Sequence, residues 1–181
     1  HLYGNFDLHG NLYDGTVYMY DGATFTEGSD YNQVYIESEV TLRSNIKANV
    51  EVYDVYDGNL IIHSGKSYII DGNLRVRSGL SIEKEAEFTV LGNVDLNYGT
   101  LINHGTATFN GDVTLYCGTL INNGTVIFNG DVSCDDRGYS VIEQTLDSAK
   151  MYFRGNVTAY TYKEPGISAG TVILDGGEAQ E

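Results

Sequence analysis

Short runs along the chain place an apolar residue at every second position. Residues 111–129 contain three such runs, and alternation of this kind is the pattern of a β-strand with one buried face. The positions expected to face inward are Val113, Leu115, Leu120, Val126 and Phe128. This segment is therefore predicted to form three short strands separated by turns.

The preceding segment carries the same pattern. Residues 92–110 read GNVDLNYGTLINHGTATFN and residues 111–129 read GDVTLYCGTLINNGTVIFN, an offset of 19 residues. The equivalent inward positions are Val94, Leu96, Leu101, Ala107 and Phe109. Strand patterns that recur about every 20 residues are typical of solenoids, in which each repeat forms one coil. We therefore predict an all-β fold, a right-handed parallel β-helix (β-solenoid) with 19–20 residues per coil.

A Gly-Asn or Gly-Asp pair opens successive repeats, and an apolar residue follows each pair. The pairs begin at Gly58, Gly72, Gly92, Gly111, Gly130 and Gly155. Further corners are expected at His104-Gly105 and Asn123-Gly124. We expect the corner glycines to supply positive φ angles, and the corner asparagines to stack as side-chain amides.

The chain is predicted to be one continuous domain with three parts. Residues 1–57 are irregular and Tyr-rich, and they form coils or a cap; residues 58–175 form the regular solenoid; residues 176–181 are a tail. An insertion at 133–154 adds six residues to its coil, because the interval between markers there is 25 residues instead of 19. Within it, residues 143–150 are expected to form a short helical turn or a protruding loop.

The charge balance limits the possible partners. Lys and Arg number 10 and Asp and Glu number 25, a formal net charge of −15. This balance argues against nucleic acid and against anionic membrane surfaces. No run approaches the roughly 20 apolar residues of a membrane span. The start HLYGNFDLHG lacks the features of a signal peptide, and we expect the chain to be part of a larger multidomain protein.

The two cysteines, Cys117 and Cys134, are too few for a disulfide scaffold. Shifted by one repeat, Cys134 falls at the position of Leu115, two residues before Cys117. The two Cα atoms would then lie roughly 8 Å apart, beyond the range of a disulfide. Two thiols in or beside the core are the favoured interpretation.

Tyrosines are the main candidates for ligand contact. Of the 15 in the chain, eight fall within the first 56 residues. Exposed tyrosines beside Asp and Asn suit sugar binding, through ring stacking and polar contacts. The candidate ligand-binding residues are Tyr31, Tyr35, Tyr53 and Tyr56. The alternative is that these tyrosines serve strands or a cap.

Acidic residues at the start of the insertion suggest a metal site. Asp131, Asp135 and Asp136 form a candidate calcium site, because hard cations prefer several oxygen ligands. The alternative is a solvated acidic turn, and no calcium-loop motif of the D-x-D-x-D-G type occurs. No other cofactor is expected.

Catalysis is not expected. A β-helix polysaccharide lyase or hydrolase needs a basic residue or clustered carboxylates in a cleft. Only Lys84 and Arg137 lie among several acids, and Lys84 fits a solvated charged turn more simply.

The repeat G-[ND]-[VL]-x-[LV]…G-T-L-I-N-x-G-T-x-x-F-N resembles those of bacterial secreted and surface-anchored β-solenoid proteins, including adhesin-like shafts. The likeness covers residues 72–132 and, more loosely, 155–175. It implies an extracellular or cell-surface location and a non-enzymatic role. We expect a binding or adhesion module that contacts glycan or a host or partner protein. A structural spacer and a β-helix carbohydrate-active enzyme are the alternatives.

Overall fold

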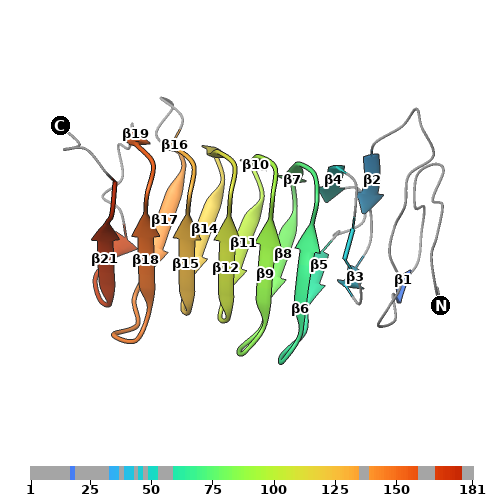
Figure 1. Ribbon diagram of the computed structural model, residues 1–181, viewed down its shortest axis with the longest axis horizontal. Helices are drawn as coiled ribbons and strands as arrows, with labels where there is room; N and C mark the ends of the chain where they lie inside the picture. The colour runs from blue at the N-terminus through green and yellow to red at the C-terminus, as the bar shows by residue number, and fades with distance from the viewer. Residues whose placement is uncertain are drawn as a thin grey trace.

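The computed structural model of the protein describes residues 17–18, 33–36, 39–42, 45–46, 49–52, 59–134, 139–158 and 166–176. Every regular element among these residues is a β-strand, and the strands stack along one long axis (Figure 1). The protein is a parallel β-solenoid, which confirms the predicted fold class.

The described strands form three parallel sheets. The eight-stranded sheet contains β1 (Val17–Tyr18), β3 (Glu39–Leu42), β5 (Asn59–Ile62), β8 (Gly79–Ile82), β11 (Thr100–Asn103), β14 (Thr119–Asn122), β17 (Val141–Gln144) and β20 (Gly166–Ile167). The seven-stranded sheet contains β2 (Gln33–Ile36), β4 (Asn49–Val52), β7 (Leu74–Val76), β10 (Val94–Asn97), β13 (Val113–Tyr116), β16 (Val132–Cys134) and β19 (Val157–Thr158). The six-stranded sheet contains β6 (Ser67–Ile70), β9 (Glu87–Val90), β12 (Thr106–Phe109), β15 (Thr125–Phe128), β18 (Lys150–Phe153) and β21 (Thr171–Leu174).

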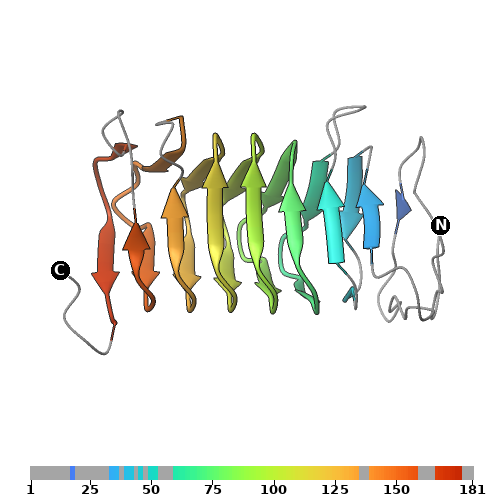
Figure 2. The ribbon, with the colours of Figure 1, turned by 90° about the horizontal axis from the view of Figure 1, so that it is seen from above.

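The sequence repeat sets the register between coils. Val94 pairs with Val113 in the seven-stranded sheet, Thr100 with Thr119 in the eight-stranded sheet, and Phe109 with Phe128 in the six-stranded sheet. Each pair differs by the predicted offset, so strands of successive coils lie side by side (Figure 2). Strands β1 to β4 pair into the same sheets, and the proposed boundary at residue 57 stays a prediction.

The predicted inward positions form the core. All ten residues named for the coils at 92–110 and 111–129 are at most 1% exposed. Phenylalanines stack in one column, with ring centroids 5.8 Å apart for Phe109–Phe128 and 4.9 Å apart for Phe128–Phe153. Burying a side chain of this size contributes about 1.5–3 kcal/mol, so the repeated columns are the main source of stability.

A ladder of amides also lies inside the solenoid. Asn103, Asn122 and Gln144 are fully buried and occupy successive coils of the eight-stranded sheet. Asn103 Nδ2 donates to Asn122 Oδ1 at 2.9 Å, and Asn122 Nδ2 donates to Gln144 Oε1 at 2.7 Å. These amides also bond to backbone groups at the neighbouring corner, among them the carbonyls of Thr125 and Lys150. The ladder therefore fixes the turn into the six-stranded sheet.

The insertion keeps the register. Of the two structures expected for residues 143–150, a helical turn or a protruding loop, the helical turn is wrong, because residues 145–149 form a non-helical connection between β17 and β18. Glu143 and Gln144 end strand β17, where Ile142 pairs with Leu120. Compared with the preceding coil, three extra residues fall between Cys134 and Val141, and three more between Val141 and Lys150. Strand pairing with Ile167 and the buried amide ladder hold Gln144 in the sheet.

The reason given for the corner glycines also needs correction. Among the described glycines, only Gly65 and Gly170 have positive φ angles. At Gly111, a Cβ atom would lie 2.5 Å from the carbonyl oxygen of Gly92, and at Gly130 it would lie 2.6 Å from the carbonyl carbon of Gly111. Glycine is required at these corners because the backbones of successive coils approach too closely for any side chain.

The two cysteines occupy the predicted positions. Cys134 pairs with Leu115 in the seven-stranded sheet and is buried, whereas Cys117 is partly exposed at a corner. Both remain thiols, as favoured from the sequence.

Candidate functional site

The outer face of the seven-stranded sheet is polar. Its central column runs through successive coils and is made of Glu51, Arg75, Asp95, Thr114 and Ser133. Arg75 Nε lies 2.9 Å from Asp95 Oδ2, and Arg77 Nε lies 2.7 Å from Glu51 Oε1. Both arginines are therefore paired with carboxylates on the same face, which makes this part of the sheet locally neutral.

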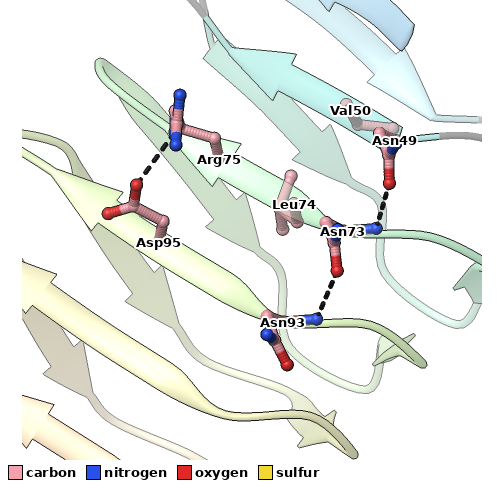
Figure 3. Close-up of a pocket in the computed structure, with 7 residues that line it drawn as sticks. All are labelled: Asn49, Val50, Asn73, Leu74, Arg75, Asn93 and Asp95. Carbon is pink, nitrogen blue, oxygen red and sulfur yellow. Dashed lines mark hydrogen bonds and ion pairs between the residues drawn. The ribbon is translucent and has the colours of Figure 1, made fainter. Parts of the chain in front are cut away.

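A shallow pocket of about 320 Å³ lies at one edge of this face. Figure 3 shows Asn49, Asn73 and Asn93 lined up on successive coils beside the Arg75–Asp95 pair. Asn49 Oδ1 accepts the backbone N–H of Asn73 at 2.8 Å, and Asn73 Oδ1 accepts that of Asn93 at 2.8 Å. The pocket wall is thus held by a ladder in which each side chain binds the backbone of the next coil.

The same ladder explains the second residue of the Gly-Asn/Asp marker. Asn93 Oδ1 accepts the N–H of Asp112, Asp112 Oδ1 accepts that of Asp131, and Asp131 Oδ1 accepts that of Asn156, at 3.0, 3.0 and 2.8 Å. Asn and Asp are interchangeable here because the position needs only an acceptor oxygen. As expected, corner amides also stack: Asn129 Nδ2 donates to Asn110 Oδ1 at 2.6 Å.

Of the three residues of the predicted calcium site, only Asp131 lies in the described part of the chain. One oxygen of Asp131 serves the marker ladder, while Asp135 and Asp136 lie outside the described residues. Across the described ranges, no group of three or more His, Cys, Asp or Glu side chains is placed to hold a metal ion. The calcium site stays a prediction.

Tyrosines lie at the corner between the seven-stranded and eight-stranded sheets. Counting back two residues from the paired Thr100, Thr119 and Val141 gives Tyr98, Cys117 and Tyr139 on three successive coils. Tyr98 is 64% exposed and Tyr139 is 68% exposed. The ring of Tyr116 meets that of Tyr98 edge-on, with centroids 5.5 Å apart. We call Tyr98, Tyr116, Cys117 and Tyr139 the aromatic corner.

The backbone of the aromatic corner is unusual. Tyr98 and Cys117 have φ angles of 61° and 52°, a left-handed conformation that costs a non-glycine residue about 1–2 kcal/mol. The following residues, Gly99 and Gly118, lie against the backbone of the previous coil, at Val76 and Leu96. The same conformation at Tyr98 and Cys117 belongs to the turn of the repeat, which brings Gly99 and Gly118 against the preceding coil.

The pKa of the Tyr98 hydroxyl is shifted by its neighbours. Its hydrogen bond with Tyr116 raises the pKa of Tyr98 above its ordinary value of 10, and the charges of Tyr116 and Cys117 add to the effect. Tyr98 therefore remains a neutral phenol at physiological pH, able to exchange hydrogen bonds with a polar ligand.

The tyrosines singled out from the sequence are only partly placed. Tyr31, Tyr53 and Tyr56 lie outside the described residues. Tyr35 lies in β2 and pairs with Glu51, so its backbone belongs to the polar column of the seven-stranded sheet. The aromatic corner was missed, although Tyr98 and Cys117 occupy the same place in the two copies of the repeat.

A different corner holds an ion pair. His63 Nδ1 lies 3.0 Å from Glu83 Oε2, and the same oxygen accepts the backbone N–H of Ser64 at 2.8 Å. The Ser64 hydrogen bond and then the His63 contact lower the pKa of Glu83 below its ordinary value of 4.5.

Comparison with known proteins adds no identity. No protein-family model, no curated protein and no solved structure matches this chain. The described residues include no helix that is long and apolar enough to cross a membrane. The three parallel sheets define the fold class as a parallel β-solenoid.

Proposed function

We propose that this protein is a non-catalytic binding module that takes a glycan on the aromatic corner and the adjoining seven-stranded sheet. The observation that carries the proposal is the exposure of Tyr98 and Tyr139, each of which lies two residues before a strand of the eight-stranded sheet, β11 and β17. Tyrosine rings offer flat apolar faces to sugar rings, and their hydroxyls bind sugar hydroxyls. The neighbouring Thr, Ser and Asn side chains supply further polar contacts.

The proposed setting is the surface of a bacterial cell or a secreted protein, with the solenoid as an adhesive part of a larger chain. The repeat resemblance and the net charge of −15 support this setting. The tyrosines at 31, 35, 53 and 56 stay candidate ligand contacts on the sequence pattern alone.

A structural spacer is the second candidate. Parallel pairing runs along the eight-stranded sheet from β1 to β20. A rod of stacked coils of this kind can separate neighbouring domains without binding any ligand. The spacer role does not need the exposed tyrosines Tyr98 and Tyr139, and for this reason we rank it second.

A glycan array tests the proposal. The wild type is expected to bind at least one glycan class, and the Tyr98→Ala/Tyr139→Ala variant to bind it at least tenfold more weakly, a loss of about 1.4 kcal/mol. Tyr152→Ala is the matched control, because Tyr152 is a half-buried tyrosine on the outer face of the six-stranded sheet. No signal from the wild type on any glycan would refute glycan binding and leave the spacer.

A further inference from the structure

We infer that the ligand of the aromatic corner is an uncharged polysaccharide whose chain lies parallel to the long axis of the solenoid. This inference rests on the proposed function and specifies its ligand. It follows from the spacing of the two exposed tyrosines and from the pairing of charges on the adjoining sheet.

The spacing of the tyrosines determines the direction. Tyr98 and Tyr139 each precede a strand by two residues, and those strands, β11 and β17, are two coils apart in the eight-stranded sheet. Neighbouring strands of a sheet lie about 4.8 Å apart, so the two backbones are separated by about 10 Å along the axis. A ligand that contacts both rings must be longer than one sugar ring and must run from coil to coil.

The charges determine the chemical class. Arg75 and Arg77, the arginines on the described part of this sheet, are already bound to Asp95 and Glu51. A polyanion would have to break these pairs and would also be repelled by a chain of net charge −15. An uncharged polymer can bind without breaking these ion pairs and is not repelled by the net negative charge.

The polar groups beside the tyrosines match sugar hydroxyls. Thr114 Oγ1 and Ser133 Oγ lie 3.3 Å apart on neighbouring coils, and either hydroxyl can donate or accept. Asn97 lies at the position equivalent to Tyr116 on the preceding coil. Because Thr114 and Ser133 are uncharged and lie on neighbouring coils, they can bind hydroxyls of successive sugar units.

Affinity gel electrophoresis of the whole chain tests the inference. Uncharged galactomannan and β-glucan are compared with polygalacturonate and alginate, at low salt and at high salt. We expect retardation only by an uncharged polymer, to a similar extent at both salt concentrations, and at least tenfold weaker binding for Tyr98→Ala/Tyr139→Ala than for Tyr152→Ala. A Cys117→Tyr variant, which completes the row of rings, is expected to bind at least as tightly as the wild type.

The outcomes separate the two proposals. Retardation by the polyanions alone, or by both classes equally, would overturn the uncharged ligand and leave glycan binding intact. Retardation by an uncharged polymer that is unchanged in the double variant would overturn the placement at the aromatic corner. Retardation by no polymer would overturn both the inference and the proposed function.

Discussion

Asn122 is the residue whose loss should weaken the fold most for its size. Its side chain makes four hydrogen bonds: it accepts from Asn103 Nδ2 and the N–H of Gly124, and it donates to Gln144 Oε1 and the carbonyl of Lys150. Asn122→Ala removes these four hydrogen bonds at a position with no exposed surface, where water cannot replace them. A buried polar group without a partner costs about 1–3 kcal/mol, and Asn103 Nδ2 keeps its bond to Thr125. We therefore expect a loss of about 3–5 kcal/mol in the free energy of unfolding.

Urea unfolding measures this loss, and the slope of the unfolding free energy against urea concentration should be the same for both variants. Asn110→Ala is the matched control, because Asn110 takes part in an amide ladder on the exposed surface. The control should change stability by about 0.5 kcal/mol or less. If Asn122→Ala and Asn110→Ala lose equal amounts of stability, the reasoning that the buried ladder must be fully bonded is wrong.

Two further substitutions test the corners. Gly111→Ala should destabilise the fold by about 2 kcal/mol or more in the same urea assay, because the new Cβ would collide with the backbone at Gly92; a variant as stable as the wild type would contradict the close approach of the coils. Glu83→Gln should be less stable than the wild type at neutral pH, because the folded-state pKa of Glu83 is lowered. The stabilisation by ionised Glu83 is present at pH values above the unfolded-state pKa of 4.5, and it is lost as the pH falls through the lower pKa of the folded state. The melting temperatures of the two proteins should therefore converge in acid. A difference in melting temperature that does not depend on pH would contradict the Glu83 contact.

The register could be predicted because the copied segments differ by a constant offset and each strand has a period of two. The same counting, continued from Leu101 and Leu120, places Asn103 and Asn122 inward, and both are buried. Residue type alone does not indicate the inward position, because asparagine is usually a turn residue. A polar residue at an inward position of a repeat signals a ladder when the next coil carries another amide.

Other features depend on contacts between coils that one coil cannot reveal. The corner glycines are required by the distance between stacked backbones, which is known only once the coils are assembled. Tyr139 could not be aligned with Cys117, because three additional residues between Cys134 and Val141 break the constant offset. Only the strand pairing therefore places Tyr139 two coils away from Tyr98.

The central claim is that Tyr98 and Tyr139 contact one ligand chain, and NMR of the tyrosine rings tests it most directly. Ring signals assigned by single substitutions would be followed while uncharged galactomannan or β-glucan fragments are added. The account predicts that the Tyr98 and Tyr139 signals shift together with one dissociation constant, while the signal of Tyr152 does not move. Shifts confined to Tyr152, or no shift of either corner tyrosine with a polymer that binds the protein, would contradict it.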